Sequence, residues 1–231
     1  MPLLFNSRFL IVAVRMLIAG IDEAGRGPCL GPMVMAVALI KKDDEEKLVG
    51  LGVNDSKLLS AKERERQFPE IKKILLENEC IHISPKEIDE YRLHKSLNEL
   101  EAMHAARLLN ALKQKPDVVY VDSPDIVMEE FAKRIRKYIS FKTKIISEHK
   151  ADLNYPIVSA ASIIAKVERD GAIKKLALEF GEIGSGYPGD EVTIRFLKNY
   201  LLQHSVMPKF ARQSWQTISA MENERLQKKL F

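Results

Sequence analysis

The stretch Met16-Leu-Ile-Ala-Gly-Ile-Asp22-Glu23-Ala-Gly25-Arg26-Gly27-Pro28 carries the strongest structural signals of this chain. Its apolar first half has the length and composition of a buried strand, which places Asp22 and Glu23 at the strand's C-terminal end. In α/β proteins, ligands bind in the crevice beyond the carboxyl ends of the strands. Adjacent carboxylates repel each other unless a proton or cation intervenes, and oxygen ligands suit Mg²⁺ or Mn²⁺. The stretch therefore predicts a metal site at a strand end.

The glycine-flanked arginine that follows points to phosphoryl-transfer chemistry. Gly25 and Gly27 allow a ligand to approach the backbone closely, and the Arg26 guanidinium is planar and suited to phosphate. Two alternatives remain open on these residues alone. One is a strand that runs into an ordinary polar turn, where aspartate and glycine are common. The other is a phosphate loop of the actin-like type, although no further glycine-rich phosphate loops of the right kind follow.

Composition sets broad limits on the class of protein. The chain has 231 residues, a hydrophobic fraction of 46% and a charged fraction of 29%, which is ordinary for a globular protein with one large domain. The net charge of +4 is compatible with a polyanionic partner but does not require one. The two cysteines, Cys29 and Cys80, have no metal-ligand spacing, so zinc and a disulfide framework are not expected. A reducing compartment, and hence a cytoplasmic location, fits this cysteine usage.

The N-terminal residues 1–15 stand apart from the rest of the chain. The segment from Leu3 to Val14 is apolar but is interrupted by Arg8, and it is too short to cross a membrane. It also lacks a clear signal-peptide cleavage site. We interpret it as an extension from an upstream start or as a disordered arm, and we expect no membrane association.

Strand and helix patterns alternate after this point, which predicts an α/β fold with helices packed against a sheet. Capping boxes begin three helices, at Ser60, Ser84 and Ser96. The predicted strands after the first are 32–40, 80–83, 117–121 and 143–146, and the main predicted helices are 60–79, 97–115, 125–138 and 157–180, with further helices after 189. We expect a catalytic domain over 16–188 and a helical C-terminal appendage over 189–231.

Acidic residues end or follow three of the predicted strands. Asp22 and Asp122 each end an apolar run, and Asp152 comes soon after another. Carboxylates that converge at one sheet edge would hold divalent cations, as in nucleases that use two metal ions. Each acid also has a structural interpretation, because Asp122 can cap a turn and Asp152 can favour a helix N-terminus. Glu168 and Asp170 are interpreted as solvated helix charges.

The segment Gly20–Pro28 resembles the opening signature of the type 2 ribonucleases H, in particular archaeal ribonuclease HII. The segments Val119–Pro124 and His149–Asp170 resemble the family's second and third acidic segments, and the likeness covers most of 16–215. The resemblance implies a ribonuclease H-like fold: a central mixed sheet flanked by helices, with a helical C-terminal appendage. It also implies that Asp22, Glu23, Asp122 and Asp152 are the catalytic acids and bind two Mg²⁺ or Mn²⁺ ions.

The same resemblance implies which residues recognise the substrate. Gly25, Arg26 and Gly27 would contact 2′-hydroxyls at an RNA–DNA junction, and Tyr187 would pack on the following deoxyribose. Lys57 is a candidate for phosphate contact. Lys209, Arg212 and Trp215 are candidates to hold duplex backbone, although a core position is the simpler interpretation of Trp215. The alternatives are a plain glycine-rich turn around Tyr187 and solvated lysines.

We therefore predict a metal-dependent endonuclease that hydrolyses the RNA strand of RNA–DNA hybrids. It would also cut 5′ to single ribonucleotides in duplex DNA and leave 3′-hydroxyl and 5′-phosphate ends. The alternatives are a structure-selective DNA nuclease on the same fold and a non-catalytic RNA–DNA binding module. We expect a monomer. The tail Gln227–Phe231 resembles a sliding-clamp-binding motif but lacks its second aromatic residue.

Overall fold

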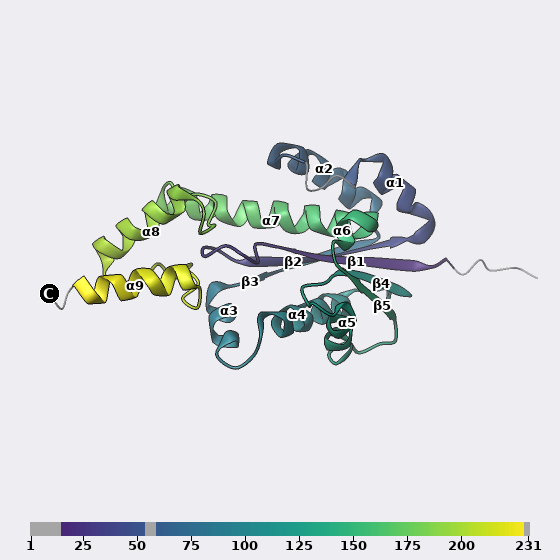
Figure 1. The fold of residues 1–231 in the computed structure, drawn as a ribbon. Helices are drawn as coiled ribbons and strands as arrows, with labels where there is room; N and C mark the ends of the chain where they lie inside the picture. Colours follow the sequence, from purple (N-terminus) through teal and green to yellow (C-terminus); the bar gives the residue numbers. More distant parts are fainter. Residues whose placement is uncertain (1–14, 54–58, 229–231) are drawn as a thin grey trace, which may run out of the picture.

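The computed structural model describes residues 15–53 and 59–228, which form a sheet between two layers of helices, with more helices at one end (Figure 1). The strands are β1 (Leu17–Ala24), β2 (Met33–Lys41), β3 (Glu77–Ile83), β4 (Val118–Asp122) and β5 (Lys144–Glu148). The helices are the 3-10 helix η1 (Lys42–Asp44) and the α-helices α1 (Glu45–Gly50), α2 (Ala61–Ile74), α3 (Pro85–Arg92), α4 (Leu97–Ala111), α5 (Met128–Arg136), α6 (Ala151–Asn154), α7 (Pro156–Phe180), α8 (Glu191–His204) and α9 (Gln216–Lys228).

Strand β1 lies at the centre of the sheet, whose order is β3-β2-β1-β4-β5. It pairs antiparallel with β2 and parallel with β4, so the sheet is mixed, as predicted. In the parallel pair, Ile21 lies opposite Val121. The residues that follow them, Asp22 and Asp122, are therefore brought to the same edge of the sheet.

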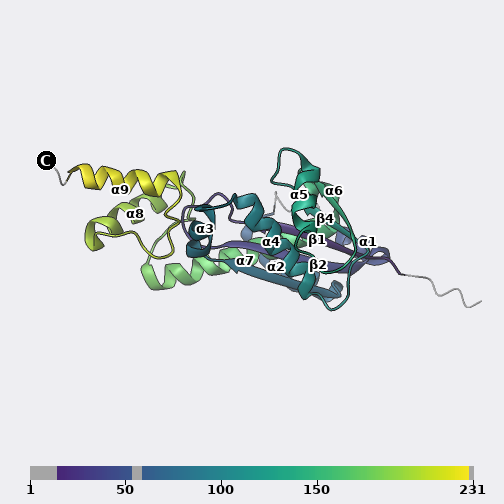
Figure 2. The ribbon, with the colours of Figure 1, turned by 90° about the horizontal axis from the view of Figure 1, so that it is seen from below.

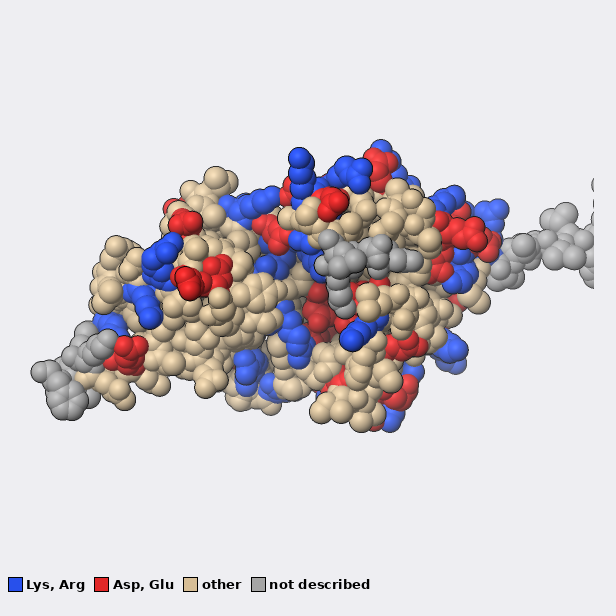
Figure 3. Space-filling view, turned by 45° about the horizontal axis from the view of Figure 1, so that its top comes forward, with Lys and Arg blue, Asp and Glu red and all other residues tan. Residues whose placement is uncertain are grey.

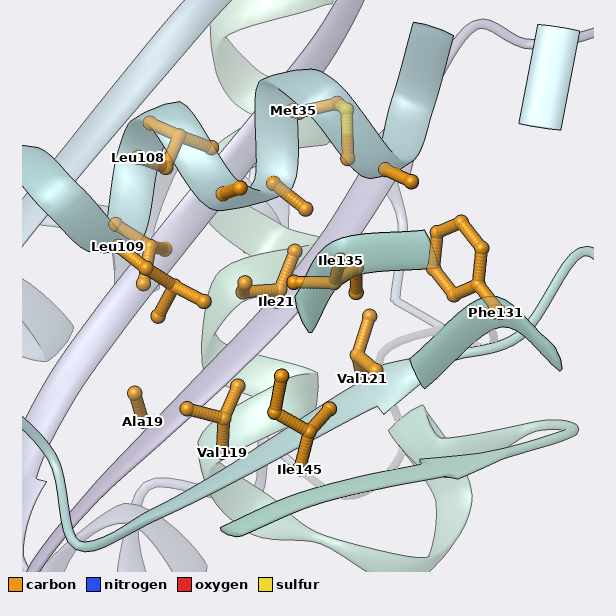
Figure 4. Packing of buried hydrophobic residues seen from close by; sticks show 14 of the residues in the cluster. Ala19, Ile21, Met35, Leu108, Leu109, Val119, Val121, Phe131, Ile135 and Ile145 are labelled. Carbon is orange, nitrogen blue, oxygen red and sulfur yellow. The ribbon is translucent and has the colours of Figure 1, made fainter. Parts of the chain in front are cut away.

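Helices cover both faces of the sheet, which explains why β1 and β2 are nearly continuous apolar runs. The helices α1, α2 and α7 pack on one face, and α3, α4 and α5 pack on the other (Figure 1). Figure 4 shows strand residues such as Ile21 and Val121 packed against Phe131 and Ile135 of α5. The two apolar layers hold the strand ends, and therefore their acids, in fixed positions.

Gly20 allows α7 to lie directly on β1. A Cβ atom at this position would come within 2.4 Å of the Ile157 backbone carbonyl, at the start of α7. Contacts that short do not occur between real atoms, so only glycine permits this approach. The small residue two positions before Asp22 thus fixes the distance between α7 and the predicted metal site.

The three predicted capping residues are at helix N-termini, but several helix ends differ from prediction. Ser60 and Glu63 form the full reciprocal capping box, and Ser84 and Ser96 each accept one hydrogen bond from the backbone three residues on. The helix predicted over 60–79 ends at Ile74, because residues 77–79 pair with β2 and extend β3. The helices predicted over 97–115 and 125–138 are also shorter at their ends.

The C-terminal helices form a third apolar cluster at one end of the molecule, beyond α3 in both views (Figures 1 and 2). This cluster contains Leu197 and Leu201 of α8 and Ile218 of α9, but also Cys29 and Leu30 from the loop after β1. Leu30 forms an antiparallel bridge with Ala211. The helical C-terminal region therefore packs directly against the loop that contains Gly25–Gly27. Among the described residues, no helix has the length and apolar character that a membrane crossing requires.

Candidate active site

Asp22 lies in β1 on the face covered by α7, where its side chain is almost fully buried. Burial raises the pKa of the Asp22 carboxyl well above its usual value, and the charges of Glu23 and Asp122 raise it further. The hydroxyl of Ser162 on α7 acts in the opposite direction. Asp22 is thus a buried acid surrounded by other acids, which is the environment that a cation would stabilise.

Glu23 points to the opposite face of the sheet from Asp22, as alternation along a strand requires. Burial raises the pKa of Glu23 to about 8, and the charges of Glu101 and Asp122 contribute in the same direction. The Arg26 guanidinium lowers this pKa, but its effect is smaller than that of burial. Asp122 influences both Asp22 and Glu23, so the three acids lie close enough to repel one another.

Asp152 is placed beside these acids by a backbone hydrogen bond. The Ala151 N–H donates to Asp122 Oδ1 at 2.8 Å, so the residue before Asp152 is fixed to the end of β4. Asp152 is buried, and its carbonyl accepts a hydrogen bond from the Ser159 hydroxyl on α7. The short helix α6 thus brings the fourth predicted acid from a distant part of the sequence to the same sheet edge.

One face of the molecule has a mixed charge distribution. Figure 3 shows acidic side chains gathered in a recess near the middle of one face, with lysine and arginine side chains on both sides. A recess of this kind can accept divalent cations at its centre and polyanion backbone at its rim. Such a surface is compatible with the polyanionic partner considered in the sequence analysis.

Arg26 is held by two residues of α4 that the sequence analysis did not select. Its guanidinium forms an ion pair with Glu101 and donates a hydrogen bond to Asn98 Oδ1 at 2.7 Å. Glu101 is fully buried, and burial raises its pKa to about 7 even though Arg26 lies beside it. One signal was present in the sequence: Glu101 is four residues after Leu97, which places it on the buried face of the helix.

The carbonyl groups of Gly25, Arg26 and Gly27 are held by the C-terminal region. Arg212 donates to the carbonyl oxygens of Gly25 at 2.6 Å and Arg26 at 2.9 Å, and Trp215 Nε1 donates to that of Gly27 at 3.1 Å. Arg212 is completely buried. The prediction that Arg212 contacts duplex backbone is therefore wrong, because its guanidinium is used inside the protein to shape this loop.

Tyr187 lies next to the same loop. A Cβ atom on Gly27 would be 3.7 Å from the Tyr187 ring, and the ring also packs against the Arg169 guanidinium at 5.3 Å. The carbonyl of the preceding residue, Gly186, accepts hydrogen bonds from the Cys29 and Leu30 amides. The structure therefore brings Tyr187 together with Gly25–Gly27, whereas Lys57 lies outside the described residues.

A mixed sheet with this strand order, covered on both faces by helices, defines a ribonuclease H-like protein. The family model for Ribonuclease HII matches residues 19–218, and the chain belongs to the ribonuclease HII family. It is an endoribonuclease, a hydrolase that acts on RNA–DNA hybrids.

Individual relatives agree with this assignment. Ribonuclease HII of Thermococcus onnurineus is 47% identical over 215 residues, which cover 93% of each chain. The crystal structure of ribonuclease H2 from Pyrococcus horikoshii is similar with a TM-score of 0.87 and 46% identity, over 92% of this chain and 100% of that one. The ribonuclease HII in a PCNA complex from Archaeoglobus fulgidus is similar with a TM-score of 0.80 and 40% identity, over 87% and 96% of the two chains.

Proposed function

We propose that Asp22, Glu23, Asp122 and Asp152 together bind two divalent ions, Mg²⁺ or Mn²⁺, and that the enzyme depends on them. The raised pKa values of Asp22 and Glu23 support this proposal, since they reflect carboxyl groups that are buried beside other acids. Hard divalent ions prefer oxygen ligands of this type. The acids at this edge thus have the chemistry that such ions require.

When bound, two such ions would activate the attacking water and stabilise the leaving oxygen of the phosphodiester. The protein's own contribution is to hold the acids in place. The sheet register fixes Asp22 and Asp122, and the Ala151 amide orients the Asp122 carboxylate. Arg26, held by Glu101 and Asn98, presents a cation near these acids, where it would contact a substrate phosphate.

Cleavage occurs, in this proposal, 5′ to a ribonucleotide, including a single one in duplex DNA, and leaves 3′-hydroxyl and 5′-phosphate ends. Gly25, Arg26 and Gly27 would recognise the 2′-hydroxyl, which distinguishes RNA from DNA. Their carbonyls each accept one internal hydrogen bond and keep a second lone pair for a substrate hydroxyl. Tyr187 would pack on the next deoxyribose, and Lys57 would contact phosphate.

The observation that carries the proposal is the convergence of Asp22, Glu23 and Asp122 at one sheet edge. The test is cleavage of a labelled DNA duplex that contains one ribonucleotide, with Mg²⁺ or with a chelator. We expect a metal-dependent cut on the 5′ side of the ribonucleotide, and we expect Asp122→Asn to abolish it. Asp43→Asn, on the exposed part of η1, is the charge-matched control and should cut normally.

The alternatives give different results in the same assay. Equal cutting of an all-DNA duplex would indicate a structure-selective DNA nuclease and would contradict 2′-hydroxyl recognition. Binding without cutting, in the presence of Mg²⁺ and Mn²⁺, would indicate a non-catalytic binding module.

We also propose that the tail Gln227–Phe231 binds a sliding clamp. The support is the motif-like sequence together with the Archaeoglobus fulgidus relative, which was solved as a PCNA:RNase HII complex. Residues 229–231 lie outside the described part of the chain. A binding assay with a purified archaeal clamp tests the proposal: deletion of 227–231 should abolish binding, and failure of the intact protein to bind would refute it.

A further inference from the structure

Cysteine, histidine and glutamate side chains meet at β3, which β2 separates from the acids of β1. Cys80 and His82 are two positions apart on β3, so both face α7, and Glu168 of α7 crosses above them. His82 Nε2 lies 3.5 Å from Glu168 Oε2. The ligand atoms that Cys80, His82 and Glu168 can offer all lie within 4.8 Å of one another.

This combination of ligands is typical of zinc rather than magnesium. Zn²⁺ binds cysteine sulfur at about 2.3 Å, and histidine nitrogen and carboxylate oxygen at about 2.0–2.2 Å, in tetrahedral geometry. Those bond lengths put a nitrogen and an oxygen ligand about 3.4 Å apart, close to the distance between His82 and Glu168. Mg²⁺ prefers oxygen ligands only, so a Mg²⁺ ion would not compete for these three residues.

The cluster is separate from the acid site. Cys80 pairs with Ala36 of β2, and Ala36 in turn pairs with Asp22 of β1. Neighbouring strands are about 4.8 Å apart, so Cys80 is about 10 Å from Asp22 along this row. None of the three residues belongs to the set proposed to hold the catalytic ions.

The surroundings leave room for a fourth ligand. His82 and Glu168 line a surface groove of about 530 Å³, together with Pro32 and Pro85. Cys80 is not in the groove wall but is partly buried beneath it, among the apolar residues under α7. An ion held by the three side chains would therefore have its remaining coordination position open to water in the groove.

We propose that Cys80, His82 and Glu168 bind one zinc-type divalent ion, with water as the fourth ligand. The ion joins β3, which is an edge strand, to α7. Glu168 is followed by Arg169, whose guanidinium donates to the Ser185 carbonyl at 3.0 Å in the loop that precedes Tyr187. Metal at this position thus fixes the part of α7 that supports the tyrosine loop.

A titration of the full-length protein with Co²⁺ tests the proposal. Co²⁺ replaces zinc in such sites and gives a thiolate-to-metal charge-transfer absorption, which the four acids cannot produce because they include no sulfur. We expect one Co²⁺ per chain with this absorption, and displacement by Zn²⁺. Cys80→Ser should abolish the absorption, whereas Cys29→Ser and Asp122→Asn should retain it.

Two further variants distinguish the loss of a direct metal ligand from a general change in nearby charge. Loss of an outer-sphere partner weakens metal binding by about 10–100-fold, so loss of a direct ligand in Glu168→Gln should weaken it by about tenfold or more. Glu70→Gln, an exposed charge change on α2 outside the groove, should leave the affinity unchanged. Absence of the thiolate absorption in the wild type, its persistence in Cys80→Ser, or equal weakening by Glu70→Gln would overturn the proposal.

Discussion

Arg212 shows how one buried residue shapes a loop that is distant in the sequence. Its guanidinium also donates to the Gly31 carbonyl at 3.1 Å, so it holds both ends of the turn that follows β1. Burial lowers the pKa of Arg212 to about 10, and the nearby Arg169 contributes, yet the side chain stays charged at neutral pH. A planar group with several N–H donors is needed here, because the guanidinium donates hydrogen bonds to three carbonyl oxygens at once.

We predict that Arg212→Lys destabilises the protein and impairs recognition together. Lysine cannot reproduce the forked geometry, so buried carbonyls lose their partners at a cost of about 1–3 kcal/mol each. We expect the free energy of unfolding to fall by about 2–4 kcal/mol. Urea denaturation and kcat/KM on a single-ribonucleotide duplex measure both effects. Arg195→Lys, on the exposed side of α8, is the control, and an equal loss there would contradict the assignment.

At the scale of elements, the ends of β1 and β4 bring the carboxyl groups of Asp22, Glu23 and Asp122 close enough to repel one another. The Glu23 carboxyl has a pKa of about 8 in the folded protein and an ordinary value of 4.5. At pH values between these two pKa values, the Glu23 carboxyl holds a proton in the folded protein and releases it in the unfolded chain. Folding is therefore favoured at low pH, and this contribution is lost as the pH rises toward 8.

We predict that the chelator-treated protein becomes less stable as the pH rises from about 5 to 8, and that Mg²⁺ reduces this loss. The cation replaces the proton between the carboxylates, and ligand binding to the folded state alone stabilises it. Denaturant unfolding at several pH values, with EDTA and with Mg²⁺, measures the effect. Glu23→Gln should flatten the metal-free profile; a profile identical to wild type would contradict the role given to Glu23.

The contact between β1 and α7 is a second element-scale feature with a clear test. We predict that Gly20→Ala destabilises the protein by about 1–3 kcal/mol or more, because the new methyl group overlaps the backbone at Ile157 and Val158. Gly171→Ala, within the same helix α7, meets no atom within 4 Å and should be neutral or stabilising by about 0.5–1 kcal/mol. Thermal unfolding distinguishes them; equal effects would show that α7 is free to shift.

At the scale of the whole molecule, the C-terminal helices and the loop after β1 share one apolar cluster. Cys29 and Leu30 are fully buried in it, alongside Leu197 and Ile183. The division into a catalytic domain over 16–188 and an appendage over 189–231 remains a prediction. Because the contacts between the two parts include Arg212 and the Leu30–Ala211 bridge, we propose that they unfold together.

Leu197→Ala tests whether the parts are coupled. Loss of this fully buried side chain should cost about 2–5 kcal/mol. If the parts unfold together, fluorescence of Trp215 and far-ultraviolet circular dichroism will report one transition, shifted equally by the substitution. Leu202→Ala, an exposed neighbour on α8, should change stability by less than about 0.5 kcal/mol. Two separate transitions would contradict joint unfolding.

The sequence predicted much of the fold because its signals are local. The apolar run before Asp22 and the capping serines at Ser60, Ser84 and Ser96 depend on neighbouring residues, and the structure agrees with them. The start of β3 was missed, because the pairing of Glu77 with Leu39 overrides the helical pattern there. Local preference is a weak influence where a strand partner is available.

The order of elements, the acids as candidate site residues and the likeness to ribonuclease HII could all be inferred from the sequence. Three contacts became visible only in the folded chain: Glu101 pairs with Arg26, Arg212 is buried on the Gly25–Gly27 loop, and Glu168 meets Cys80 and His82. The sequence could not show these contacts, because the burial and the partners of a charged side chain depend on segments that are far apart in the chain. Periodicity reports which face a residue occupies, but not which distant group lies opposite it.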